Sequence, residues 1–184
     1  MDFERVKFDY IQKIAKKFNK ITEENKKELL EDSEKYNFTK VLEEIIKNIV
    51  DSKFDFKDVN AMIIVLSNFN QIYDNFSQKY ADYLKKHLNE FNEMMAKTQA
   101  RNEEDEEKRS FRKKTLLRLY IESYCYGLVN DFKTIHEIFL SLIQKKENLL
   151  HNFPILVNLL KIFAENIFGI KPKYIVKAIE VRLI

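Results

Sequence analysis

Six basic residues lie close together in one stretch of the sequence and are its strongest candidates for binding a ligand. The cluster consists of Lys108, Arg109, Arg112, Lys113, Lys114 and Arg118. Lysine and arginine side chains hold the phosphates of nucleic acids and release condensed counterions when they do so. We therefore expect a candidate RNA-binding site here. The alternative is a solvated helix face that the preceding acidic run, Glu103 to Glu107, partly neutralises.

A weaker candidate of the same kind lies near the N-terminus. Lys13, Lys16, Lys17 and Lys20 fall largely off an apolar stripe and would face solvent. Proteins hold single-stranded nucleic acids with basic residues interleaved with exposed aromatic rings. Neither basic cluster shows that interleaving, so an ordinary solvated surface is the competing interpretation for both.

The sequence offers no recognisable catalytic or metal-binding pattern. His87, His136 and His151 fall on three different predicted elements, and none has a second histidine or a cysteine at metal-ligand spacing. Cys125 lies on an aromatic face, where a packed core cysteine is more typical than a reactive thiolate. We therefore predict no catalytic, metal-binding or cofactor-binding residue, no cofactor and no enzymatic activity. An enzyme with an unrecognised site is the alternative.

The composition predicts an all-α fold. The 184 residues include two glycines and two prolines, whereas strand-rich folds need turn residues at every hairpin. Apolar residues make up 45%, which is enough for a core, and the formal net charge of +3 provides no strong overall field for nucleic acid. A single cysteine fits a reducing compartment, and no apolar run is long enough to span a bilayer.

Apolar residues recur at steps of three and four along nearly the whole chain, which is the spacing of amphipathic helices. We expect helices near 3–21, after 22, at 39–52, 58–73, 80–95, 116–128, 135–143, 154–167 and from 172 onward. Pro154 and Pro172 suit the first turns of the last two. The stretch from Asn102 to Ser110 has no apolar residue, and we expect a charged, mobile loop at about 98–110.

Successive amphipathic helices joined by short links pack as antiparallel hairpins. We expect the helices at 39–52 and 58–73, those at 80–95 and 116–128, and those at 135–143 and 154–167 to form pairs. Stacked pairs of this kind make a HEAT-like or armadillo-type helical repeat, an α-α superhelix. A closed helical bundle is the competing fold.

Three segments resemble the up-frameshift protein 2 family, also called regulator of nonsense transcripts 2. They are Phe38–Lys53, Lys57–Ala61 and Leu66–Tyr73. The residues shared with the family pattern are Asn37, Lys40, Lys53, Asp58, Val59, Asn60, Gln71 and Tyr73. The sequence departs from that pattern at Asn70, where histidine is usual, and at Ile72, where arginine is usual.

The resemblance implies a specific domain. It is similar to the first of the family's three domains of the kind found in the middle of translation initiation factor 4G. Residues 37–184 would form this middle-type helical-repeat domain, and residues 1–36 would form an N-terminal helical extension. The resemblance transfers no binding residue to this chain.

The resemblance also implies a function. The chain would be a non-catalytic scaffold or adaptor in nonsense-mediated mRNA decay, with protein-binding and RNA-binding surfaces. Its partners would be an RNA helicase and an exon-junction-associated factor, reached through other domains of the full chain, with RNA as a further ligand and no membrane. The expected location is the cytoplasm, with a perinuclear position also open. The alternative function is a translation-initiation type of middle domain that binds a DEAD-box RNA helicase.

Overall fold

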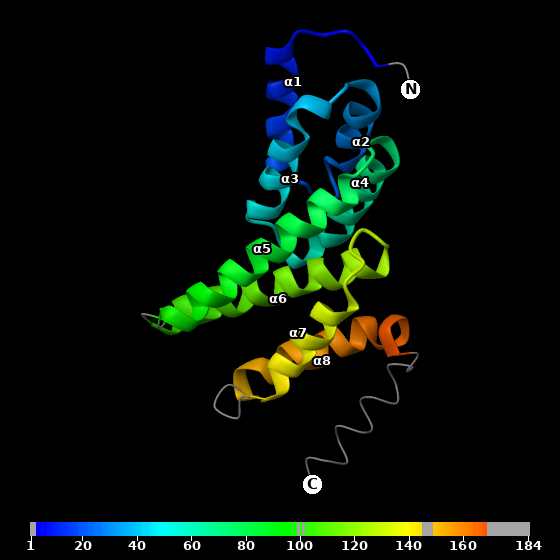
Figure 1. Ribbon diagram of the computed structural model, residues 1–184. Helices are drawn as coiled ribbons and strands as arrows, with labels where there is room; N and C mark the ends of the chain where they lie inside the picture. The colour runs from blue at the N-terminus through cyan, green and yellow to red at the C-terminus, as the bar shows by residue number, and fades with distance from the viewer. Residues whose placement is uncertain (1–2, 99, 101, 145–148, 169–184) are drawn as a thin grey trace. The chain divides into compact units, whose positions relative to one another are not determined.

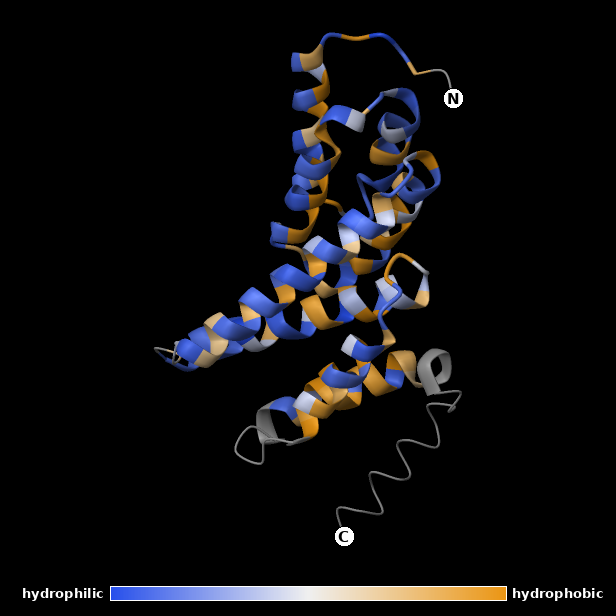
Figure 2. Cartoon of the chain, in the orientation of Figure 1, coloured by the Kyte–Doolittle hydropathy of each residue, from blue (hydrophilic) through white to orange (hydrophobic). Residues whose placement is uncertain are grey.

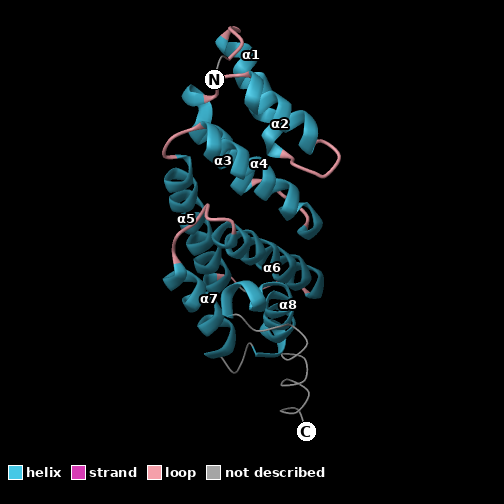
Figure 3. Ribbon diagram, turned by 90° about the vertical axis from the view of Figure 1, so that its right-hand side faces the viewer, coloured by secondary structure: helices cyan, strands magenta, loops and turns pink. Residues whose placement is uncertain are grey.

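The structure is a computed structural model that describes residues 3–98, 100, 102–144 and 149–168. Within these residues every regular element is a helix, so the all-α prediction is confirmed (Figures 1 and 3). The chain divides into two compact units, residues 1–130 and 131–184, and each is described by itself below. In the described ranges, no helix combines the length and the apolar character needed to cross a membrane.

The first unit contains six α-helices and three short 3-10 turns. In chain order they are α1 (Phe8–Ala15), η1 (Lys16–Asn19), α2 (Lys26–Lys35), η2 (Thr39–Val41), α3 (Leu42–Asp51), η3 (Phe56–Asp58), α4 (Val59–Ile72), α5 (Phe76–Lys97) and α6 (Glu103–Cys125). Hydrophobic and hydrophilic residues alternate in bands along these helices (Figure 2). This banding is what the three- and four-residue spacing of the sequence requires.

The helices of the first unit stack on one another as a helical repeat. Helix α2 packs on α4, α3 packs on α5, and α6 packs on both α4 and α5. The predicted pairing of α5 with α6 is therefore confirmed. The predicted pairing of α3 with α4 is not the main contact of either helix, because each packs more closely on a helix two places away.

A column of aromatic rings runs through the core of this unit. Phe18 of η1 lies edge-on to Phe38 and to Phe69 of α4, with ring centroids 5.7 and 5.2 Å apart. Phe69 then stacks on Phe76 at 5.6 Å, and Phe76 stacks on Tyr80 of α5 at 6.0 Å. All five rings are buried. Offset and edge-on ring pairs add to the gain from burial alone, so the column joins segments far apart in the sequence.

Polar groups complete the core at two points beside the column. The Tyr80 hydroxyl lies 2.8 Å from the Ser123 hydroxyl of α6, which itself donates to the Leu119 carbonyl. The Tyr73 hydroxyl accepts from the Phe38 backbone N–H at 2.9 Å and donates to the Tyr36 carbonyl at 3.2 Å. Each phenol therefore satisfies buried polar groups that would otherwise lack partners.

The N-terminal helix begins later than predicted. Residues 3–7 are not helical, because this segment makes other contacts: the Glu4 N–H donates to the Lys35 carbonyl, and the Phe3 ring stacks on Tyr73. Val6 and Tyr10 fit the three- and four-residue apolar spacing, yet they are 38% and 47% exposed. In the same segment, Ile14, Phe18 and Ile21 are buried.

Helices α1 and α2 and the turn η1 belong to the same compact unit as α3–α6. Phe18 of η1 shares the aromatic column with Phe69 of α4. The assignment of residues 1–36 to an extension and of 37–184 to a middle-type domain stays a prediction.

The second unit contains α7 (Phe132–Gln144) and α8 (Leu149–Phe168), which pack on each other as predicted. Asp131 starts α7 by accepting hydrogen bonds from the backbone and the hydroxyl of Thr134. Helix α8 begins at Leu149 rather than at Pro154, so the proline lies inside the helix and removes one backbone hydrogen bond there. The helix predicted from Pro172 onward lies outside the described residues.

Replacing Tyr73 by phenylalanine should destabilise the first unit by about 1–3 kcal/mol, because the buried Phe38 N–H loses its acceptor. Urea unfolding followed by far-UV circular dichroism measures this change. Tyr126→Phe is the matched control, since that ring is 60% exposed. Equal stability of the two variants would show that the Tyr73 hydroxyl does not support the fold.

Candidate nucleic-acid interface on helix α6

All six residues of the predicted RNA-binding cluster lie on one long helix, α6. The sequence predicted a charged loop over 98–110, and that prediction is wrong for residues 103–110, which form the first turns of α6. The Asn102 side chain caps the helix by accepting from the Asp105 N–H at 2.9 Å. Four acidic residues in the first turn favour the positive end of the helix dipole, so a stretch without apolar residues is helical.

Arg118 is held inside the fold rather than presented to solvent. Its Nε donates to Glu122 at 2.6 Å and its Nη1 donates to the Phe56 carbonyl at 2.7 Å. The guanidinium also lies 4.1 Å from the centre of the Phe56 ring. Glu122 is buried, so this ion pair is largely shielded from water. These contacts fasten the connection between α3 and α4 to α6.

Arg112 makes a similar but less complete set of contacts. Its Nη2 donates to the Val50 carbonyl at 3.3 Å, and the guanidinium lies 4.8 Å from the centre of the Phe54 ring. Its Nη1 is buried and has no hydrogen-bond acceptor among the described residues. Burial lowers the pKa of Arg112, and the nearby Asp51 carboxylate opposes that shift.

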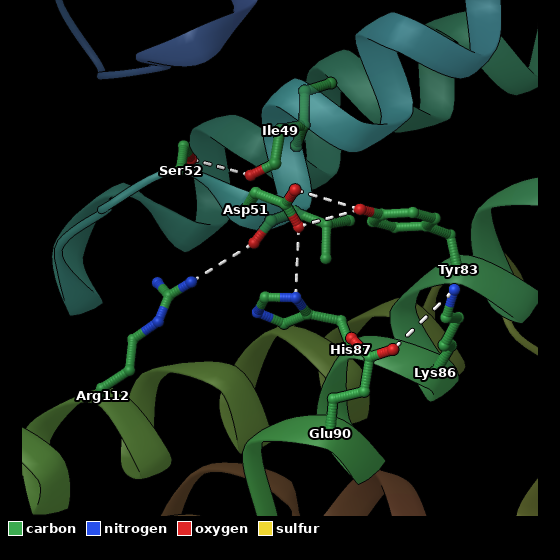
Figure 4. A network of polar contacts seen from close by, with 9 residues as sticks. Ile49, Asp51, Ser52, Tyr83, Lys86, His87, Glu90 and Arg112 are labelled. Carbon is green, nitrogen blue, oxygen red and sulfur yellow. Dashed lines mark hydrogen bonds and ion pairs between the residues drawn. The ribbon is translucent and has the colours of Figure 1, made fainter. Parts of the chain in front are cut away.

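Asp51, the last residue of α3, gathers side chains from α5 beside Arg112 (Figure 4). The Tyr83 hydroxyl donates to its carboxylate at 3.0 and 3.1 Å, and His87 Nδ1 lies 3.1 Å from Oδ1. Partial burial and then the Asp51 charge raise the pKa of Tyr83 to about 12. Partial burial also lowers the pKa of His87, although Asp51 opposes this. We call these four side chains the α3–α5–α6 network.

Three of the remaining four cluster residues differ in their surroundings. Lys108 is exposed and pairs with Glu104 one turn earlier. Arg109 pairs with Asp105 at 2.9 Å and donates to the Thr98 carbonyl at 2.7 Å. Lys113 is half-buried.

The six cations therefore lie in several different environments. The guanidinium groups of Arg112 and Arg118 are directed into the protein. Lys114 remains between these two cases, with its Nζ 4.7 Å from the centre of the Phe56 ring. RNA binding through the cluster stays a prediction.

The remaining candidates of the sequence are dispersed. Lys13, Lys16, Lys17 and Lys20 are exposed, and the Glu28 and Asp32 carboxylates bind Lys17 and raise its pKa.

Of the candidate histidines, His87 joins the α3–α5–α6 network through Asp51. His136 is exposed on α7, and the His151 side chain lies outside the described set. Cys125 is half-buried at the end of α6, whereas the sequence predicted a packed core cysteine. Within the described ranges, no group of three or more histidine, cysteine, aspartate or glutamate side chains could hold a metal ion.

Local spacing in the sequence could have shown one contact of this region but not two others. The Arg118–Glu122 pair is four residues apart on one helix, which is a recognisable signal. The contacts of Arg112 with Val50 and of Arg118 with Phe56 each span 62 positions, and no periodicity connects such residues. Phe54 and Phe56 are the rings on which the cations of α6 lie.

The residues that carried the family resemblance serve the local structure in several cases. The Asn37 side chain accepts from the Thr39 N–H and hydroxyl, and Tyr73 makes the bridge described above. Asp58 and Val59 are buried where α4 begins. The other shared residues are exposed: Lys40, Lys53, Asn60 and Gln71.

Comparison with known proteins supports this resemblance at low identity. The chain is similar to regulator of nonsense transcripts UPF2 of Arabidopsis thaliana, with 26% identity over 118 residues. The match covers 64% of this chain and 10% of that protein, so the chain spans a small part of the length of its relative. No family model matches the chain, and no solved structure matches it significantly.

Replacing Arg118 by methionine should destabilise the first unit by about 3–5 kcal/mol, because Glu122 would become an unpaired buried carboxylate. Adding Glu122→Met should recover most of the loss, since the buried charge is then removed as well. Urea unfolding of the single and double variants measures both effects. Lys27→Met is the control, because its pair with Glu31 is exposed and should contribute little. A double variant as unstable as the single one would contradict this account.

The lowered pKa of His87 should make the first unit less stable in acid. An unfolded histidine titrates near pH 6.5, so below that pH the unfolded chain binds the proton more readily than the folded one. The contribution of neutral His87 to the free energy of unfolding is therefore fully present above about pH 6.5 and declines as the pH falls towards the lower pKa of the folded state. Urea unfolding between pH 7.5 and 5 should show this decline, and His87→Gln should flatten it. His136→Gln, at an exposed position, should leave the slope unchanged; an unaltered slope in His87→Gln would contradict the prediction.

Proposed function

We propose that this chain is a non-catalytic scaffold domain of the nonsense-mediated mRNA decay machinery, whose helices present surfaces to protein partners. The observation that carries the proposal is the similarity over 118 residues to regulator of nonsense transcripts UPF2. The name of that relative refers to nonsense transcripts, and we extend this role to the present chain.

The architecture supports the same role. Helical repeats expose long surfaces on stacked helices, and their usual function is to bind other macromolecules. The polar networks of α6 join one helix to the connection between two others. Arg118 fixes Phe56, and Arg112 fixes the end of α3 at Val50. Such contacts set the relative positions of the helices, which is what a scaffold requires.

The finer parts of the proposal rest on the resemblance of the sequence. The chain would correspond to the first middle-type domain, and it would have no enzymatic activity. Other domains of a longer chain would contact an RNA helicase and an exon-junction-associated factor. The cytoplasm, including its perinuclear region, would be the place of action.

The experiment is capture of partners on the purified chain from a eukaryotic cytoplasmic extract, quantified by mass spectrometry. Nonsense-mediated decay factors should be enriched over initiation factors. Leu84→Asp is the control bait, because it places a charge at a fully buried position of α5 and should abolish the folded surface. Enrichment of initiation factors alone, or equal capture by the control bait, would contradict the proposal.

A second measurement separates the scaffold from the translation-initiation alternative. Helical-repeat folds are shared between functions, so the fold cannot distinguish the two. A purified DEAD-box helicase of the initiation type should not bind the chain. Adding the chain should also leave the ATPase rate of the helicase unchanged. Binding with stimulated ATPase activity would favour the alternative.

A further inference from the structure

We propose that a composite basic surface, made by Lys53 and Lys57 of the α3–α4 connection together with Lys114 of α6, binds the phosphates of single-stranded RNA. The inference rests on the proposed function, because it gives the RNA-binding part of that function a different location. It replaces a cluster that is contiguous in sequence with one that only the fold assembles.

The first step is the position of the α3–α4 connection against α6. Arg112 binds the carbonyl of Val50 just before the connection, and Arg118 binds the carbonyl of Phe56 within it. Lys114 lies between these two arginines on the helix, and its ammonium group lies 4.7 Å from the centre of the Phe56 ring. Lys57 follows Phe56 directly in the chain. The ring thus brings lysines of two distant segments to one place.

The second step is the charge that remains available there. Lys53 and Lys57 are exposed, and neither makes an ion pair or hydrogen bond with any described residue. Two acids of this region are already occupied: Asp51 accepts from Tyr83, and Glu122 pairs with Arg118. Two exposed acids remain: Asp55 on the connection, and Glu24, whose carboxylate interacts electrostatically with Lys57 and Lys20. The surface therefore keeps an excess of positive charge.

The third step is the extension of this charge toward the N-terminal segment. Lys57 and Lys20 both act electrostatically on Glu24 and lower its pKa. Lys20 is exposed and belongs to the weaker of the two basic clusters in the sequence. The fold therefore brings one member of that cluster near the connection, which neither sequence cluster indicated alone.

The fourth step is the chemistry of the ligand. Proteins that hold single-stranded nucleic acid line the phosphate backbone with basic residues, often beside exposed aromatic rings on which bases stack. Phe56 is half-buried, with Lys114 and Arg118 over its ring, so it positions Lys114 and does not serve as a stacking platform. At the start of α6, by contrast, Lys108 and Arg109 are already paired with acids of the same helix. RNA phosphates are thus better matched by the composite surface than by the start of α6.

The test is a titration of a fluorescent oligouridylate with the full chain at several salt concentrations, followed by anisotropy. The triple variant K53Q/K57Q/K114Q should bind on the order of 100-fold more weakly at 0.1 M salt, and its plot of log affinity against log salt should be shallower by about 2. The matched control K7Q/K27Q/K40Q removes the same charge from other exposed positions and should change both quantities little.

The double variant K53Q/K57Q leaves Lys114 in contact with the Phe56 ring. It therefore distinguishes a loss of RNA binding from a folding defect in the triple variant. It should retain the far-UV circular dichroism of the wild type and show about two thirds of the slope change of the triple variant. No RNA binding by the wild type, or an equal loss in the control, would overturn the proposal. So would a loss that follows Lys108, Arg109 and Lys113 instead. Tighter binding of polyglutamate than of RNA would identify an acidic protein as the ligand and overturn it as well.

The capture experiment is scored separately from this titration. If K53Q/K57Q/K114Q still enriches decay factors but the wild type binds no RNA, the RNA surface fails and the scaffold function stands. If the wild type captures no decay factors, the scaffold proposal fails on its own evidence.

Discussion

The column of aromatic rings is the constraint on which the first unit depends. Phe18 belongs to η1, whereas Phe69 and Tyr80 belong to the consecutive helices α4 and α5, and contacts between rings join this early turn to the later helices. Large rings bury much surface and tolerate few orientations, so the column fixes the angles between helices as well as their proximity. The polar bridges of Tyr73 and Tyr80 are built around it and satisfy backbone and hydroxyl groups that the rings seal from water.

The column explains why α6 can use its arginines internally. With α4 and α5 fixed, the connection between α3 and α4 comes to lie against α6, where Arg112 and Arg118 reach its carbonyl groups and rings. A guanidinium suits this position because it donates several planar hydrogen bonds and stacks on an aromatic face at once. A run of basic residues in a sequence is therefore not by itself a basic surface. Its charge reaches solvent only where the fold provides no acceptor.

The same reasoning bears on the role of the chain. A scaffold needs helices whose mutual positions do not change when a partner binds. The α3–α5–α6 network and the Arg118 contacts support that rigidity where three helices and a connection meet. The buried Nη1 of Arg112 has no acceptor among the described residues, so this part of the arrangement is left unsatisfied.

The sequence by itself determined the helical fold and most of the helix positions, because scarce glycine and proline and a three- and four-residue apolar spacing are local properties. Local reasoning failed at residues 103–110, where capping by Asn102 and dipole-favoured acids compensate for the missing apolar residues. Only the tertiary structure decided that α3 packs on α5 and α2 on α4, and which cations remain free. Those outcomes depend on contacts such as Arg118 with Phe56, which join residues 62 positions apart and leave no periodic trace in the sequence.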